Sequence, residues 1–296
     1  MVKHPLLRPS SAARATSSIL CARPLAGTAQ IRRAHHVPPL THETQFKSHG
    51  VPDLLSAEGY ELAWTQYQSV MMEKLNHMTA GTPDENTPTK TLLLNSARQP
   101  DQAALFNHAS MAHNNHFFFN GLSPHTTAIP SALSKTLAQD FSSIDTLRQE
   151  LVATASAMFG PGFVWLVKAT DKSQFKLLTT YLAGSPYPGA HFRRQPLDMS
   201  TQSQESLGGL SGADYARQTM TQNTVGAFGP RSQAKLAPGG ISLVPVLCVN
   251  TWEHVWLKDW GIGGKRAFLE AWWERIDWGV VANHADLGGA RRAFRA

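Results

Sequence analysis

The sequence predicts an α+β protein, because its two halves carry different periodicities of apolar residues. In the N-terminal half of the 296-residue chain, apolar residues recur at the three- and four-residue spacing of helices. In the C-terminal half, short apolar and β-branched runs are typical of strands, and helical stretches follow them. We therefore expect an N-terminal helical hairpin domain over residues 35–124 and an α/β C-terminal domain over 125–296, in which helices flank an antiparallel three-stranded sheet.

The first predicted helix covers residues 56–79, where Ser56 is a good N-cap and apolar residues follow with helical spacing. A loop rich in Gly, Pro and polar residues separates it from the next helical stretch. This second helix is predicted over 91–121, with a break near Pro100.

The rest of the chain continues with short elements. They are predicted in the order helices 130–142 and 143–158, strands 162–170, 174–184 and 241–250, and closing helices 251–257 and 264–278. Ser143 is the expected N-cap of its helix. Pro245 marks the third strand as an edge strand or the place of a bulge.

A long insertion separates the second strand from the third, over about 186–240. It is rich in Gly, Ser, Gln and Pro and has no sustained period. A compact domain rarely carries so long a structureless loop without a function, so we expect it to order, if at all, on a partner.

Positive charge is concentrated at the N-terminus. Residues 1–42 contain six Lys or Arg and no acidic residue, whereas the whole chain has 27 Lys and Arg against 21 Asp and Glu. The remainder is therefore neutral, which argues against a broad electrostatic contact with nucleic acid. An Arg-, Ser- and Ala-rich stretch free of acids is typical of a mitochondrial transit peptide, and we assign residues 1–34 to one, with the mitochondrial matrix as destination.

Cysteine usage argues against a disulfide and a Cys-based zinc site, and hydropathy argues against a membrane-spanning helix. Cys21 lies in the predicted transit peptide, so Cys248 would be the only cysteine of the processed chain. That rules out an intrachain disulfide and a Cys-based zinc site. No apolar run approaches the ~20 residues that a membrane-spanning helix needs.

Histidines on the second helix and after the third strand suggest a metal site. His113 and His116 lie at i and i+3 on one helix face, and His254 follows the third strand beside Glu253. Iron and manganese favour imidazole plus carboxylate ligands. The alternative to an iron or manganese site is a zinc site built from His108, His113, His116 and His254.

Three stretches resemble the iron/manganese superoxide dismutase family. "LVPVLCVNTWEHVWLKDW" resembles the family's D-x-W-E-H-A-Y motif, "FNHASMAHNNHFFFNGLSP" resembles F-N-G-G-G-H-x-N-H-S-x-F-W-x-N-L-S-P, and "GPGFVWLV" resembles the G-S-G-W-G-W-L strand. The match covers roughly residues 52–185 and 241–283. The resemblance implies a dismutase-like fold with two metal ligands in the last motif.

The family's ligands can be carried over one at a time, and the site is then degenerate. Its first His corresponds to Ala63, and its Asp corresponds to Asn250. Its second His falls on either Asn115 or His116, because this segment is one residue longer. Only the last His is kept, as His254, which we interpret as a relic that hydrogen-bonds in the core. Asn is neutral and a poor ligand for first-row transition metals, so we expect no catalytic residues, no metal and no cofactor.

The resemblance also points to a pairing surface. The family's acid at the position of Glu253 reaches across a dimer interface. The candidate interface residues are Trp252, Glu253, Phe117, Phe118 and Phe119.

A transit peptide, a dismutase-like body and missing ligands together resemble the non-catalytic dismutase-fold proteins of the fungal mitochondrial small ribosomal subunit. This implies a structural role in mitochondrial translation, neighbours among small-subunit proteins, a dismutase-like heterodimer with a related subunit, and limited rRNA contact. The candidates for that contact are Arg193, Arg194, Arg217, Arg231, Arg291, Arg292 and Arg295. The alternatives are a mitochondrial Mn or Fe superoxide dismutase with a rearranged ligand set and an assembly or regulatory factor.

Overall fold

The structure of the chain is a computed structural model, and it describes residues 35–97, 99–170, 173–187, 190 and 243–286. The predicted transit peptide, most of the predicted insertion and the C-terminal tail lie outside these residues. So do all seven arginines predicted to contact RNA.

The N-terminal half of the described chain is helical, as predicted. Its elements are α1 (Glu43–His49), α2 (Ala57–Tyr60), the π-helical turn η1 (Glu61–Gln66), α3 (Tyr67–Thr79), α4 (Thr89–Ser96), the 3-10 turn η2 (Pro100–Gln102) and α5 (Ala103–Asn120). The predicted helix at 56–79 is thus α2, η1 and α3 run together, and Ser56 caps it by accepting from Gly59 N at 2.9 Å. The predicted break at Pro100 is confirmed by η2, which begins at that residue because proline lacks the N–H that a helix interior needs.

The C-terminal half brings helices and strands together, also as predicted. Its elements are α6 (Ser131–Phe141), α7 (Ile144–Ala157), β1 (Gly162–Ala169), β2 (Phe175–Tyr181), β3 (Leu243–Asn250), α10 (Glu253–Trp260), α11 (Lys265–Trp273) and α12 (Trp278–His284). The predicted closing helix 264–278 is shorter than expected, because Asp277 starts a new helix by accepting from Gly279 N and Val280 N.

The sheet is antiparallel with strand order β2-β1-β3, so β3 is an edge strand within the described residues. Its register on β1 pairs Phe163 with Asn250 and shifts between Leu166 and Val167, where the partner is Pro245. Both features predicted from Pro245, an edge strand and a bulge, are therefore present.

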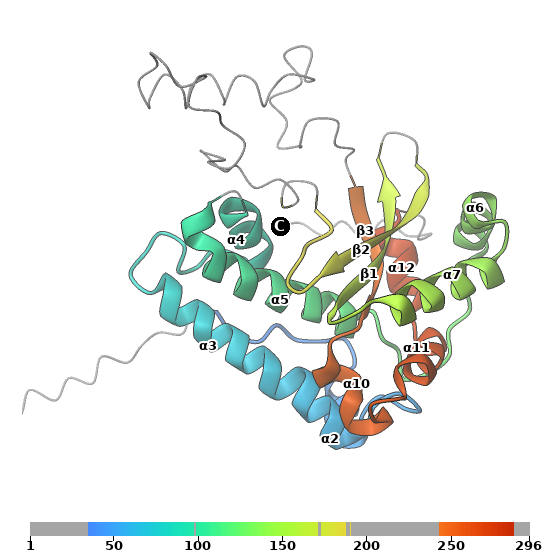
Figure 1. Ribbon diagram of the computed structural model, residues 1–296, viewed down its shortest axis with the longest axis horizontal. Coiled ribbons are helices and arrows are strands. Elements are labelled where there is room, and N and C mark those ends of the chain that lie inside the picture. Colours follow the sequence, from blue (N-terminus) through green and yellow to red (C-terminus); the bar gives the residue numbers. More distant parts are fainter. Residues whose placement is uncertain (1–34, 98, 171–172, 188–189, 191–242, 287–296) are drawn as a thin grey trace, which may run out of the picture. The chain divides into compact units, whose positions relative to one another are not determined.

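Helix α5 connects the helical half to the sheet. It packs against α3 and α4 on one side and against β3 on another, as Figure 1 shows. The largest fully buried side chains include Trp64, Trp165 and Trp272, from the helical half, the sheet and α11 respectively. One continuous apolar core therefore spans both halves and fixes the ends of α5 and β3 beside each other.

Candidate metal site

Three of the four positions carried over from the family meet at the junction of the helical half and the sheet. Asn115 Nδ2 on α5 donates to the backbone O of Ala63 in η1 at 3.3 Å. Asn250 Nδ2, at the end of β3, donates to Asn115 Oδ1 at 3.2 Å. All three residues are 0% exposed. The sequence therefore located the junction, and the structure shows that neutral amides fill it.

The strand-to-helix turn holds Asn250 in place. Its Oδ1 accepts from the backbone N of Trp252 at 2.9 Å, which is the local turn that Asn side chains favour. This bond ends β3 and leads into α10. Asn250 thus uses its acceptor for the turn and its donor for the contact with α5.

Gln68 on α3 completes the network, and sequence reasoning missed it. Its Oε1 accepts from Asn115 Nδ2 at 3.2 Å, and its Nε2 donates to the backbone O of Ala112 at 2.9 Å. The side chain is 0% exposed. We define Gln68, Asn115 and Asn250 as the amide network. It is neutral, and its internal bonds join α3, α5 and β3.

The choice between Asn115 and His116 is resolved by helix geometry. Adjacent residues on a helix point about 100° apart, so only one of the two can face the junction. Asn115 faces it. His116 turns away, with its Nε2 3.4 Å from the backbone O of Pro39 and its ring 5.9 Å from that of Trp64.

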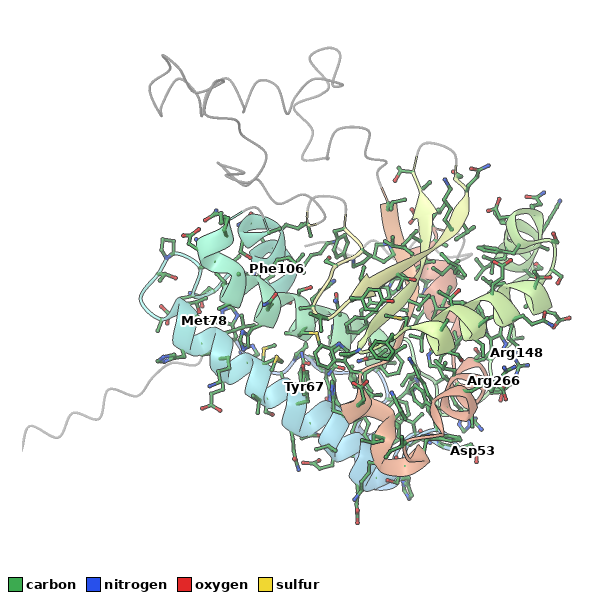
Figure 2. All side chains as sticks on the ribbon, in the orientation of Figure 1. Asp53, Tyr67, Met78, Phe106, Arg148 and Arg266 are labelled. Carbon is green, nitrogen blue, oxygen red and sulfur yellow. The ribbon has the colours of Figure 1, made fainter. Side chains whose placement is uncertain are left out.

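His254 is partly buried and stacks on an aromatic ring, and its buried Nε2 atom makes no hydrogen bond among the described residues. Its ring stacks on that of Tyr67, with centroids 3.9 Å apart and planes inclined by 10°. Tyr67 lies where α3 approaches α10 (Figure 2). The expectation that this histidine hydrogen-bonds in the core is wrong for Nε2, which has no partner among the described residues. Burial lowers the pKa of His254 to about 4, so the ring is neutral at physiological pH.

The residues at this junction do not fit iron or manganese. Asn115 Oδ1 and Asn250 Oδ1 each already accept a hydrogen bond, and Ala63 has no donor atom in its side chain. One imidazole remains, whereas a redox metal takes imidazoles together with a carboxylate. Within the described part of the chain, no three His, Cys, Asp or Glu side chains are grouped closely enough to hold a metal ion.

The structure also contradicts the alternative zinc site. It does not bring the four histidines of that site together. His108 Nδ1 contacts the backbone O of Ala104, and His113 Nε2 contacts Tyr187 Oη at 3.0 Å. Burial lowers the pKa of His113 to about 3, so this ring is neutral too. The other two histidines face Pro39 and Tyr67, as described above.

Two of the predicted interface residues are core residues instead. Phe118 and Phe119 are 1% and 0% exposed, and the ring of Phe119 packs edge-on against Tyr60. Phe117 lies on a different face of α5, with its ring between Trp165 and His284. Because α5 is covered by helices on one side and by the sheet on another, neighbouring phenylalanines can pack on different faces, Phe118 and Phe119 fully and Phe117 in part. Phe118 and Phe119 therefore offer a partner no free surface.

Trp252 is bonded to a segment that carries exposed apolar side chains. Its Nε1 donates to the backbone O of Leu182 at 3.3 Å, and Leu182 N donates to the backbone O of Pro161 at 2.9 Å. These bonds bring the loop after α7 beside the end of β2. Phe159 in that loop is 97% exposed and Leu182 is 59% exposed. We call Phe159, Tyr181, Leu182 and Trp252 the apolar patch. Glu253 follows Trp252 directly as the first residue of α10.

Charge is unevenly distributed between the described residues and the rest. The described residues hold 11 Lys and Arg against 17 Asp and Glu, a formal charge of −6. The cations in ion pairs are Lys47, Arg148, Lys258, Arg266 and Arg275. The neutral body expected from the whole sequence therefore combines an acidic described part with basic residues outside it.

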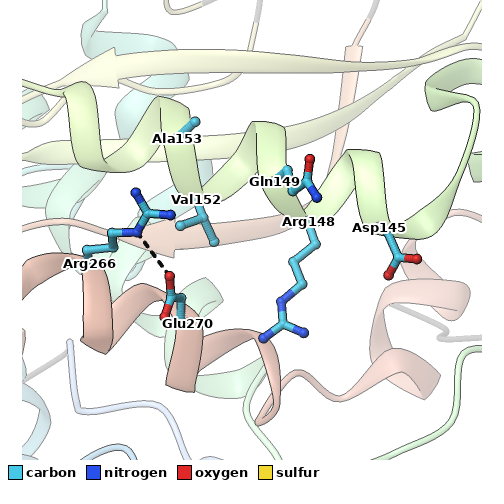
Figure 3. Close-up of a pocket in the computed structure, with 7 residues that line it drawn as sticks. All are labelled: Asp145, Arg148, Gln149, Val152, Ala153, Arg266 and Glu270. Carbon is cyan, nitrogen blue, oxygen red and sulfur yellow. Dashed lines mark hydrogen bonds and ion pairs between the residues drawn. The ribbon is translucent and has the colours of Figure 1, made fainter.

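A surface groove of about 600 Å³ lies between α7 and α11 (Figure 3). Its lining residues are Asp145, Arg148, Gln149, Val152, Ala153, Arg266 and Glu270. Arg266 pairs with Glu270 at 3.0 Å, and Arg148 pairs with Glu274 at 3.1 Å. The groove contains none of the predicted site residues, and its arginines already have acidic partners.

Comparisons with known proteins agree with the fold. The family model for iron/manganese superoxide dismutases, C-terminal domain, matches residues 129–205 and 198–284. The chain is 28% identical over 270 residues to small ribosomal subunit protein mS43 of Schizosaccharomyces pombe, covering 85% of this chain and 90% of that protein. It is 29% identical over 198 residues to small ribosomal subunit protein mS42 of the same yeast, covering 65% and 71%.

A true dismutase is a more distant relative. The iron superoxide dismutase of Helicobacter pylori is 25% identical over 144 residues, covering 49% of this chain and 65% of the enzyme.

Among the residues that the structure describes, no helix is long and apolar enough to cross a membrane.

Proposed function

The chain belongs to the iron/manganese superoxide dismutase family, and from this premise we propose that it is a structural protein of the mitochondrial small ribosomal subunit. Its similarity to two small-subunit proteins of one yeast, over most of its length for the first, supports this role over dismutation. The acid-free, Arg-rich leader supports the mitochondrial matrix as its location. In this role the protein contributes to mitochondrial translation as a structural part of the small subunit, without catalysing a reaction.

The observation that carries the proposal is the amide network. Where the family places a carboxylate and imidazoles, this chain places Asn250, Asn115 and Ala63, bonded to one another. A carboxylate near a metal offsets its charge and sets the pKa of bound solvent, and a neutral amide does neither. We infer that the chain is not an enzyme and that the junction now serves only to join the two halves.

We propose that the apolar patch, together with Glu253, pairs with a second dismutase-fold subunit. Its Phe159 and Leu182 are large apolar side chains left exposed on loops that hydrogen bonds hold in place. Aromatic anchors of this kind are typical of interface centres. The similarity to both mS43 and mS42 supports a related chain as the occupant, since one subunit would then contain two such folds.

Contact with rRNA is expected to be limited and to come from segments outside the described residues. A described part of charge −6 repels phosphate, and five of its cations already have acidic partners. The insertion and tail carry the seven candidate arginines. Replacing residues 191–240 with a short linker, which keeps the anchored Tyr187, is expected to weaken subunit association without unfolding the body.

The proposal is tested by quantitative mass spectrometry of mitochondrial small subunits purified at high salt. We expect this chain at about one copy per subunit, since a structural constituent survives a wash that removes loosely bound factors. A chain that is absent from the washed subunit refutes the proposal. A chain that is found only on immature subunits identifies an assembly factor instead.

One observation favours the competing function, a mitochondrial Mn or Fe superoxide dismutase. His254 Nε2 is buried without a hydrogen-bond partner among the described residues, and a buried imidazole nitrogen of this kind is able to hold a metal. Elemental analysis of the purified chain separates the two functions. We expect no stoichiometric Mn or Fe and no dismutase activity; about one metal ion per chain with activity would reverse the assignment.

A further inference from the structure

Asn76 on α3 holds the first described residue, His35, by both backbone polar groups. His35 N donates to Asn76 Oδ1 at 2.8 Å, and Asn76 Nδ2 donates to His35 O at 2.7 Å. The His35 ring is anchored as well, with Nε2 3.1 Å from Thr79 Oγ1, and the residue is only 7% exposed. We call these three contacts the His35 clamp.

The residues after His35 continue along the helical half. Leu40 is buried, and Val37 packs against the main core and against a smaller apolar cluster between α3, α4 and α5 that includes Leu75, Leu92 and Phe106. The backbone O of Pro39 lies 3.4 Å from His116 Nε2, and Thr41 Oγ1 donates to Asn120 Oδ1 at 3.3 Å. This N-terminal arm is thus attached to α3 at its start and to α5 further along.

We propose that the His35 clamp sets the limit of N-terminal processing, so that the leader is cut away at or before the bond preceding His35 and His35 stays in the mature chain. This inference rests on the proposed mitochondrial function. Hydrolysis adds the hydroxyl of water to the carbonyl carbon of the cleaved bond and a proton to the departing nitrogen. The amine that forms on His35 after a cut at that bond can still donate to Asn76 Oδ1.

Backbone engagement is the reason why cleavage stops there. A peptidase binds the chain around the cleaved bond in extended form through its N–H and C=O groups. At His35 both groups are already bonded to Asn76, and the side chain is buried. Cleavage beyond this point therefore requires the arm to open first, and its rate follows the population of the opened form.

The mature N-terminus can be read by mass spectrometry of the chain from purified mitochondria. We expect the first residue to be His35 or a residue upstream of it, with the start of the leader removed. A mature chain that begins after His35 overturns the proposal, and so does a chain that keeps its leader intact. The readout does not depend on ribosome binding, so its failure is distinct from a failure of the proposed ribosomal role.

Variants of the clamp test the cause. The purified full-length chain is treated with an aminopeptidase, and the wild type is expected to be trimmed to His35 and no further. In Asn76→Ala the loss of two hydrogen bonds is expected to speed removal of His35 and His36 by about tenfold or more. The exposed neighbour provides the matched control, since His77→Ala is expected to stop at His35.

Asn76→Asp covers the case in which Asn76→Ala does not fold. An Asp side chain can still accept from His35 N but cannot donate to His35 O, so intermediate trimming is expected. Thermal melting of each variant checks that α3 remains folded. The proposal is overturned if the wild type loses His35 as fast as a folded Asn76 variant does.

Discussion

Asn250 Nδ2 donates a hydrogen bond to Asn115 Oδ1 at 3.2 Å and thereby joins the end of β3 to α5. Both side chains are fully buried, and both amides have further partners in η1, α3 and the turn before α10. By the resemblance to the family, these positions correspond to metal ligands. Here the same junction is closed by neutral groups that satisfy one another, which is the condition for a buried polar network to stabilise a fold.

Removing either amide is expected to destabilise the chain. Asn250→Ala leaves Asn115 Oδ1 and Trp252 N without their partner, which is expected to lower the free energy of unfolding by about 2 kcal/mol or more. The double variant with Asn115→Ala should lose roughly 1 kcal/mol less than the sum of the single variants, because the pair interacts directly. Urea unfolding measures these values, and Asn95→Ala on the exposed face of α4 is the matched control. Strict additivity would contradict the pairing.

Buried histidines are expected to make stability depend on pH. Burial lowers the pKa of His113 to about 3 and that of His254 to about 4, against an ordinary value of 6.5 in the unfolded chain. Between these values the unfolded chain binds more protons, so stability is full above pH 6.5 and falls as the pH falls. At pH 5 each histidine is expected to remove roughly 2 kcal/mol relative to its contribution at pH 7.

Unfolding between pH 5 and 7 tests this dependence. In His254→Gln, the free energy of unfolding should fall less between pH 7 and pH 5, by the contribution of that one histidine. His77→Gln, on the exposed face of α3, should leave the pH dependence unchanged. A curve that is equally steep in wild type and His254→Gln would show that this ring does not titrate as its burial requires.

Local signals predicted most of the fold. Ser56 and Ser143 cap their helices, and Pro100 and Pro245 mark a break and a bulge, because each acts through its own backbone geometry. The start of α12 was missed, since Asp277 lies inside an otherwise helical apolar pattern.

The candidate site was predicted only in part, because its contacts are long-range. The family pattern located Asn250 and left Asn115 and His116 as alternatives, and the contribution of Gln68 depends on how α3 packs on α5. The single available signal was a polar side chain among the core-facing residues of that helix. Phe118 and Phe119 were assigned to an interface because a sequence does not reveal that α5 is covered on several sides.

Asp259 on α10 contacts the start of α2, and adding a methyl group at Gly59 is expected to disrupt this contact. Asp259 accepts from Ser56 N at 2.9 Å and from Ser56 Oγ at 2.7 Å, and a Cβ on Gly59 would lie 2.0 Å from Asp259 Oδ2. Gly59→Ala should therefore displace Asp259 and lower the free energy of unfolding by about 1–2 kcal/mol. Gly263→Ala meets no atom within 4 Å and serves as control. Stabilisation by Gly59→Ala, which helix propensity alone would give, contradicts the steric account.

The apolar patch is expected to govern pairing without governing folding. Phe159 is 97% exposed, so Phe159→Ser should change the free energy of unfolding by less than about 0.5 kcal/mol. The same substitution should abolish co-purification with the related dismutase-fold subunit. Ile262, 90% exposed in the turn between α10 and α11, provides the control, and Ile262→Ser should pair normally. Equal pairing by both variants would place the interface elsewhere.

Cryo-electron microscopy of the mitochondrial small ribosomal subunit, purified at high salt from the organism that makes this chain, tests the central claim most directly. The account predicts density for this fold at the periphery of the subunit, beside a second dismutase-like chain on the side of Phe159 and Trp252, with amide side chains and no metal density between Ala63, Asn115 and Asn250. A subunit that lacks the chain, together with a free form carrying about one Mn or Fe ion, would contradict it.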